Sequence, residues 1–171
     1  MKKNAVILSA ALLVAALVQA GEFDQDAIKA LGDIASYSHK EGYSESVSDV
    51  YLGYDAAGKV VSGAAMRAFY RNLTGLVAVT QKDGQWVISN ASIPNIASLK
   101  GAGKQKKMTD IIKNFPGSTV KDSSGALQQV DAVTGATRYS ESVYSSFNLL
   151  ARTAVEEIEK NPDWQKTPVS Q

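Results

Sequence analysis

Apolar and polar residues alternate through the middle of the chain, with a period of two that is typical of strands half-buried in a sheet. The alternation is broken at Asp55–Gly58 and at Asp83-Gly84. Aspartate and glycine tolerate the backbone of tight turns, so both breaks predict hairpins. The predicted strands are Val50–Tyr54 with residues 59–68, and residues 73–81 with Trp86–Ile88. The pattern therefore predicts an antiparallel sheet built from two hairpins.

Other segments place apolar residues at helical spacing, which predicts helices on that sheet and an α+β fold. The strongest pattern lies near the end of the chain, where Asn161-Pro162 stops it. Residues 36–48 are rich in serine and predict a loop, whereas Thr119–Val120 predicts an edge strand. The helical patterns are residues 22–37 (Ile28, Leu31, Ile34 and Ala35 on one face, capped by Asp24), then Met108, Ile111, Ile112 and Phe115, and finally Val143, Phe147, Leu150, Ala154 and Ile158.

The first 20 residues have the pattern of a cleavable secretory signal. Lys2 and Lys3 precede an apolar run from Val6 to Val18, and small residues then precede Gly21. This run is short for a spanning helix, so cleavage is favoured over a retained membrane anchor. The expected organisation is a signal peptide at 1–20, a helix and loop at 21–48, one folded domain at 49–162 and a loose tail at 163–171. We expect a periplasmic or secreted protein without a transmembrane span after cleavage.

The amino-acid composition limits the partners and the kinds of chemistry that can be expected of this chain. The chain has 171 residues and a formal net charge of +1. Loss of Lys2 and Lys3 with the leader leaves 16 basic and 17 acidic residues, a balance that gives no reason to expect nucleic acid as a partner. The absence of cysteine excludes disulfides, thiolate chemistry and a cysteine-linked lipid anchor. His39 is the only histidine, so a His/Cys metal site is excluded as well.

The stretch Asp131-Ala132-Val133-Thr134-Gly135-Ala136-Thr137 combines a carboxylate, a small turn and a hydroxyl, directly before the last predicted helix. Ser140 is a predicted N-cap, which places Thr137 just ahead of a helix N-terminus. Free N–H groups and the helix dipole favour a phosphate there. Arg138 has the geometry to neutralise one.

These residues resemble the flavinylation motif of the FMN-binding domain family, which includes flavoprotein subunits of the sodium-pumping NADH:quinone reductase and of the related Rnf complex. The resemblance covers roughly residues 44–160 and is sharp at 131–137. It implies that Thr137 carries covalent FMN through a phosphoester, added by a separate flavin transferase with FAD as donor and Mg²⁺ as its ion. It further implies that Asp131 serves the transferase reaction. Thr134, Gly135 and Ala136 then form the turn.

A second, fainter similarity concerns Thr74-Gly75-Leu76, which stands where the family has a Glu-Thr-Pro-Gly-Leu-Gly segment. The glutamate and the proline are missing here. A flavin contact from Thr74 and an ordinary strand end are both open readings. Over 49–162 the family implies an α+β domain, with an antiparallel sheet of two hairpins and flanking helices.

Each candidate also has a structural interpretation. Thr137 and Ser140 can be residues of a helix cap, and Asp131 and Arg138 can be solvated side chains. Four aromatic residues are candidates for stacking on a flavin, although packing is the more frequent role of such residues: Tyr51, Tyr54, Trp86 and Tyr139. A lysine cluster is either a solvated face or a docking patch for an acidic partner: Lys100, Lys104, Lys106, Lys107 and Lys113.

Two functions from different classes follow. The first is an exported redox carrier, in which tethered FMN relays electrons between a membrane or periplasmic donor and an acceptor. The second is a secreted ligand- or partner-binding module of the same fold, without covalent flavin. Reversible FMN binding is a third. The sequence favours a carrier, itself a substrate of the transferase, over a stand-alone enzyme.

Overall fold

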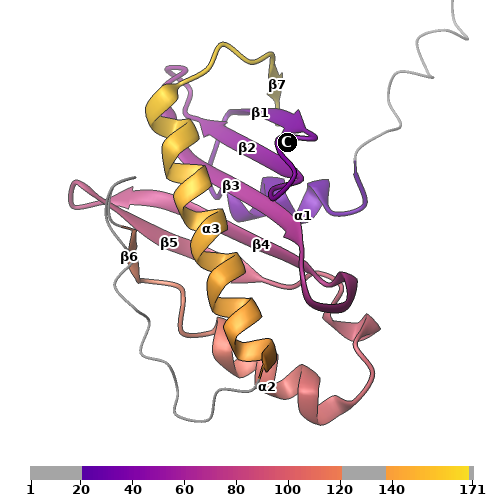
Figure 1. Cartoon of the computed structure of the whole chain (residues 1–171). Coiled ribbons are helices and arrows are strands. Elements are labelled where there is room, and N and C mark those ends of the chain that lie inside the picture. The colour runs from indigo at the N-terminus through magenta and orange to yellow at the C-terminus, as the bar shows by residue number, and fades with distance from the viewer. Residues whose placement is uncertain (1–20, 121–137, 170–171) are drawn as a thin grey trace, which may run out of the picture.

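The structure is a computed structural model that describes residues 21–120 and 138–169. It is an α+β fold in which one seven-stranded antiparallel sheet is covered on both faces by helices (Figure 1). In chain order the elements are α1 (Asp24–Ala30), β1 (Ser36–Glu41), β2 (Asp49–Tyr54), β3 (Val60–Ala68), the short 3-10 turn η1 (Tyr70–Asn72), β4 (Thr74–Lys82), β5 (Gln85–Ser92), the 3-10 turn η2 (Ile96–Ser98), α2 (Ala102–Ile112), β6 (Thr119–Val120), α3 (Arg138–Lys160) and β7 (Lys166–Pro168).

The sheet has the order β6-β5-β4-β3-β2-β1-β7, so β1 to β5 form a meander between two very short edge strands. The two predicted hairpins are confirmed as β2–β3 and β4–β5. At the tip of the second hairpin, Asp83 and Gly84 have φ values of 50° and 77°, which suit the tight turn predicted there. The edge strand predicted at Thr119–Val120 is confirmed as β6, which pairs with Trp86 and Val87.

The central strands are buried on both faces, because alternate side chains enter two different cores. The larger core lies under α3 and α2, and Val77 and Val79 of β4 point into it. The smaller core lies under α1, where Leu76 and Ala78 of the same strand meet Ala27 and Leu31. Figure 1 shows α3 crossing one face of the sheet, with α1 behind the opposite face.

The last helix confirms the strongest helical pattern of the sequence. The apolar stripe predicted for it is fully or nearly fully buried against the sheet: Val143, Phe147, Leu150, Ala154 and Ile158. The helix comes close to β3 at Gly63, where an added Cβ would lie 2.9 Å from Ile158 Cδ1 and 3.3 Å from the Ala154 carbonyl oxygen. A residue without a side chain is therefore required for this contact.

The N-terminal region differs from its prediction. The helix expected over residues 22–37 is limited to α1, and Gly32, with φ 84°, follows its end. Residues 36–41, expected to be a loop, form β1 and pair with β2 along their whole length. This strand is polar, so it carries no hydrophobic alternation. Its buried Ser38 is satisfied instead by a 2.9 Å hydrogen bond with the Tyr54 hydroxyl.

Three smaller corrections concern element ends. Asp24 does not cap α1, because its carboxylate accepts hydrogen bonds from Gly21 and Tyr51. Phe115 is buried but lies beyond the end of α2. Part of the tail expected to be loose forms β7, and Val169, directly after this strand, donates its N–H to the Ala35 carbonyl at 3.1 Å. In each case, strand pairing and side-chain packing in the folded protein decided the end of the element, and the local sequence preference did not.

A buried carboxylate joins α3 to the connection between β1 and β2. Glu157 has an exposed fraction of 4% and accepts hydrogen bonds from the Tyr43 hydroxyl, at 2.6 Å, and from the Lys160 ammonium. Burial and the bond to Glu157 raise the pKa of Tyr43. The charge of Glu157 is thus partnered, as a carboxylate at this depth requires.

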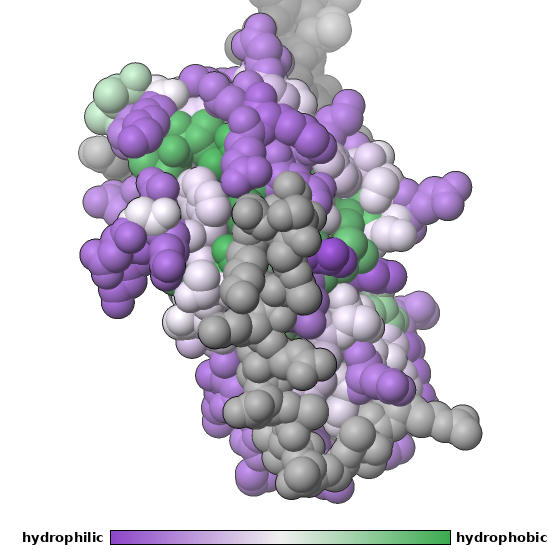
Figure 2. Space-filling view, turned by 60° about the vertical axis from the view of Figure 1, so that its left-hand side comes forward, coloured by the Kyte–Doolittle hydropathy of each residue, from purple (hydrophilic) through white to green (hydrophobic). Residues whose placement is uncertain are grey.

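On the side shown in Figure 2 the coloured residues are mostly hydrophilic, and hydrophobic ones reach the surface in small separate areas. Within residues 21–120 and 138–169, no helix is both long enough and apolar enough to cross a membrane.

Candidate functional site

The predicted flavinylation motif, Asp131 to Thr137, lies outside the described residues, as do the side chains of Arg138 and Tyr139. The backbone of Arg138 begins α3, and Ser140 is part of that helix. The prediction of Ser140 as N-cap is therefore wrong. The cap preference of serine is weak beside the packing that holds the first turns of α3, where Ser140 and Val143 are both buried.

An aromatic cluster lies under the first half of α3. Phe115 packs against Tyr144 and Phe147, with ring centroids 5.6 Å and 5.3 Å apart. Phe147 also meets Phe69, which precedes η1, edge to face at 6.0 Å. The helical spacing of Val143 and Phe147 was recognisable in the sequence. The contribution of Phe69 was not, because it comes from a distant segment.

The hydroxyl of Tyr144 is the polar end of this cluster. Its oxygen is buried and has no hydrogen-bond partner within the part of the chain that the structure describes. A buried tyrosine hydroxyl normally finds a partner, so this atom can accept or donate one further hydrogen bond.

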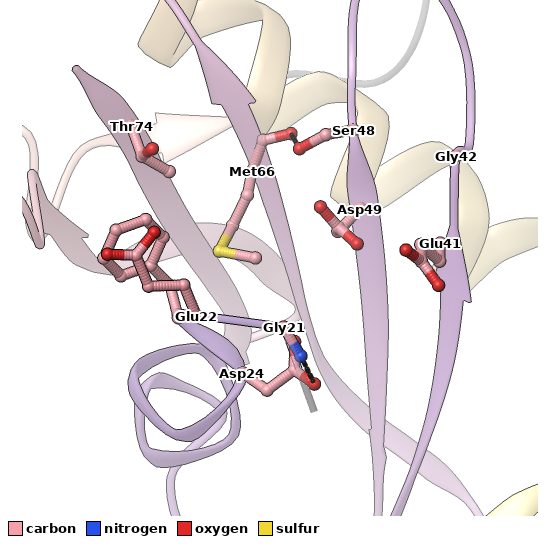
Figure 3. A pocket seen from close by; sticks show the side chains of 10 residues that line it. Gly21, Glu22, Asp24, Glu41, Gly42, Ser48, Asp49, Met66 and Thr74 are labelled. Atoms are coloured by element: carbon pink, nitrogen blue, oxygen red, sulfur yellow. Dashed lines mark hydrogen bonds between the residues drawn. The ribbon is translucent and has the colours of Figure 1, made fainter. Parts of the chain in front are cut away.

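Thr74 lies on the other face of the sheet. The next residue, Gly75, faces α3 and comes close to the Phe147 ring, so Thr74 points towards the α1 face. It lines an open pocket of about 340 Å³ between the start of α1 and the ends of β1 to β4 (Figure 3). The structure consequently does not bring Thr74 together with Ser140.

The pocket beside Thr74 is lined by carboxylates. Glu22 and Asp24 come from α1 and the residues before it, while Glu41 and Asp49 are directly opposite each other on β1 and β2. Ser48 and the thioether of Met66 complete the part seen in Figure 3, where Ser48 Oγ donates to the Met66 carbonyl at 3.1 Å. No lysine or arginine is among its described lining residues. The pocket is thus a region of negative potential.

Hydrogen bonds tie these carboxylates to the sheet. His39 Nε2 lies 2.9 Å from Asp49 Oδ1, and the His39 ring stacks on Tyr51 at a centroid distance of 4.2 Å. The Tyr51 hydroxyl donates to Asp24 Oδ1. Burial alone would raise the pKa of Asp49, but the hydrogen bond from His39, together with the polar Ser48 side chain nearby, outweighs it and lowers that pKa. Burial and the nearby Asp24 carboxylate raise the pKa of Tyr51.

Two of the four predicted stacking residues are part of the cores. Tyr51 and Tyr54 have exposed fractions of 0% and 1%, so neither offers a face to a ligand. Trp86 is half-buried and lines a second open pocket, of about 300 Å³, near the end of α3. Of the four aromatic candidates, only Trp86 is described with an accessible surface.

The lysine cluster has the features of a solvated face. All five side chains are exposed, and Lys106 and Lys113 pair with Asp110 at 2.6 Å and 3.7 Å. Among the residues that the structure describes, no group of three or more histidine, aspartate or glutamate side chains is arranged to hold a metal ion.

One network was missed at the level of sequence: Gly21, Asp24, Tyr51, His39 and Asp49, which are linked in that order. Its members come from three elements, so neither spacing nor periodicity connects them. The only signal available was the presence of two aspartates and a single histidine near predicted element ends.

The chain is therefore an α+β protein built on a single antiparallel sheet, with a helix-covered aromatic cluster on one face and an acidic pocket on the other. No family model, curated protein or solved structure matches it.

Proposed function

We propose that this chain is an exported flavoprotein of the FMN-binding domain type, carrying FMN as a phosphoester on Thr137 and relaying electrons between a membrane or periplasmic donor and an acceptor. The observation that carries the proposal is the Asp131-x-x-Thr134-Gly135-Ala136-Thr137 sequence, which ends directly before the 23-residue helix α3. A helix of this length has a positive N-terminal end, which favours a phosphate group.

The residues near the start of α3 fit such a group. The aromatic cluster of Phe69, Phe115, Tyr144 and Phe147 packs under the first half of α3 and so fixes the position of this end of the helix. Tyr144 adds a buried hydroxyl without a partner in the described residues, which suits a polar ring edge. The α+β architecture, with two hairpins and flanking helices, agrees with what the family resemblance implies.

The role of the protein in this proposal is attachment and positioning. Transfer joins Thr137 Oγ to the FMN phosphorus while the pyrophosphate bond of FAD breaks and AMP leaves; the hydroxyl proton is released to a base of the transferase. Asp131 assists that transfer together with the transferase's Mg²⁺, and Arg138 neutralises the phosphate. Bound FMN supplies the one- and two-electron chemistry. The covalent bond prevents loss of the cofactor outside the cytoplasm.

The test is co-expression with a flavin transferase. The exported protein is expected to gain the mass of one FMN moiety, to remain fluorescent on a denaturing gel, and to yield the adduct on the peptide that contains Thr137. Thr137→Ala is expected to abolish the adduct completely, because the acceptor oxygen is lost. Thr109→Ala, which changes a threonine of α2, is the matched control and should retain it.

Two other outcomes are informative. Flavin that copurifies but is lost on denaturation would show reversible binding instead of a phosphoester. A colourless protein whose melting temperature is unchanged by excess FMN would contradict the proposal and favour the secreted binding module.

A further inference from the structure

The backbone nitrogen of Gly21 donates a hydrogen bond to Asp24 Oδ2 at 2.6 Å (Figure 3). Gly21 is also the residue that becomes the first of the chain if the leader is cleaved after Ala20. The atom in this hydrogen bond would then no longer be an amide nitrogen. Hydrolysis adds water across the Ala20–Gly21 peptide bond, so that the carboxylate leaves with the leader and an amine remains on Gly21, where it is protonated.

We propose that the α-ammonium released on Gly21 by cleavage forms an ion pair with Asp24, and that this pair fastens α1 to the sheet in the processed protein. The inference rests on the export step of the proposed function. It does not depend on flavin.

Asp24 is built into the fold as the acceptor of this charge. Its exposed fraction is 6%, and its other carboxylate oxygen accepts the hydroxyl of Tyr51, a fully buried residue of β2. Tyr51 in turn stacks on His39 of β1. A charge placed on Gly21 would thus be linked through Asp24 to two strands, whereas the amide of an unprocessed chain supplies only one neutral donor.

The surroundings of Gly21 favour a cation. The pocket that it lines also contains the carboxylates of Glu22, Glu41 and Asp49. The described lining includes no lysine or arginine, and His39 reaches it through its hydrogen bond to Asp49. An α-ammonium at position 21 would offset part of this negative charge, and a charge-assisted hydrogen bond is about twice as strong as a neutral one.

The identity of residue 21 agrees with this contact. A Cβ added at Gly21 would lie 2.9 Å from Asp24 Oδ1, closer than such atoms normally approach. A side chain at the first position would therefore push the amine away from its acceptor. Glycine permits the close approach.

The experiment compares two forms of the processed protein carrying Thr137→Ala, which removes the proposed flavin site. Intact mass first establishes Gly21 as the terminal residue of the exported protein. One sample retains its free α-amine, and the other is carbamylated at that amine with cyanate. NMR titration then measures the pKa of the α-amine. Thermal unfolding is followed from pH 6 to 10.

An ion pair is expected to raise the pKa of the α-amine from about 7.7–8.0 to above about 9. Its stabilisation is complete below the unfolded pKa and is lost as pH rises through the folded one. The free-amine form should therefore melt about 3 °C above the carbamylated form at pH 6.5, and at nearly the same temperature at pH 10.

Asp24→Asn should remove the difference between the two forms, whereas Glu22→Gln, a change at an exposed carboxylate of the same segment, should preserve most of it. An ordinary amine pKa, equal melting temperatures at pH 6.5, or a mature chain that begins at another residue would overturn the inference. Failure of flavin attachment alone would leave it standing, because the measurements use the Thr137→Ala protein.

Discussion

At the scale of single residues, Asp49 shows how the sheet accommodates an unfavourable pair. It lies directly opposite Glu41 in the register of β1 and β2, and like charges in that position destabilise a sheet. The hydrogen bond with His39 gives the Asp49 carboxylate a basic partner. The His39 ring is itself held in place by stacking on Tyr51. The low pKa of Asp49 records the balance of these contacts.

A pH-dependent effect follows for Asp49→Asn. Because the folded pKa lies below the ordinary value of 3.8, the charge of Asp49 stabilises the fold above that pH, and this stabilisation is lost as pH falls through the folded pKa. We expect the variant to lose about 0.5–1 kcal/mol at pH 6 and progressively less towards pH 3, measured by urea unfolding. Asp33→Asn, at an exposed position, should show no such trend. A constant difference across this range would contradict the assignment.

At the scale of elements, a glycine of the sheet sets how closely α3 can approach it. Gly63 of β3 faces both the Ile158 side chain and the backbone carbonyl of Ala154. The side chain can rotate away from an added methyl group, but the backbone can move only if the helix moves. The packing of the larger core therefore depends on Gly63, although this residue contributes no side-chain atoms to it.

Gly63→Ala is accordingly expected to lower the free energy of unfolding by about 1–3 kcal/mol, through overpacking. The matched change is Gly103→Ala in α2, where an added Cβ meets nothing within 4 Å. That variant should be more stable by about 0.5–1 kcal/mol, because alanine favours a helix over glycine. Chemical unfolding of both proteins checks the contrast, and equal effects would refute it.

The elements that could be predicted from the sequence were those whose own residues show a hydrophobic periodicity or a turn motif. The apolar stripe of α3 and the Asp83-Gly84 turn identify themselves locally. β1 does not, because its buried Ser38 is satisfied by Tyr54, a residue of another strand. Likewise, Thr74 was recognised as a candidate from its neighbours in sequence, but only the fold could place it on the α1 face. Side-chain direction depends on the register, which the sequence leaves open.

At the scale of the whole molecule, the sheet ends in its two shortest strands. β6 has two residues and β7 three, and β7 covers only the first half of β1. Lys166 strengthens this edge, since its ammonium lies 4.1 Å from the centroid of the buried Tyr54 ring and 3.3 Å from the Gly58 carbonyl. The C-terminal residues thus close a polar edge that would otherwise be open to pairing.

Truncation after Gln165 tests this role. Loss of β7 removes its pairing with β1 and the Lys166 contact, so we expect the melting temperature to fall by about 4 °C and self-association to increase at high concentration. Differential scanning fluorimetry and light scattering measure the two effects. A chain that ends at Val169 keeps β7 and should behave as the 171-residue chain does. If the truncated protein matched it in both measurements, β7 would have no part in closing the sheet.

The burial of β2, β3 and β4 on both faces has a consequence for how the molecule opens. Val77 and Leu76 are neighbours on one strand, yet each belongs to a different core. Neither layer of helices can leave without exposing strands that the other layer also covers. The backbone amides of these strands should consequently exchange with deuterium only when the two cores open together, as a single cooperative unit.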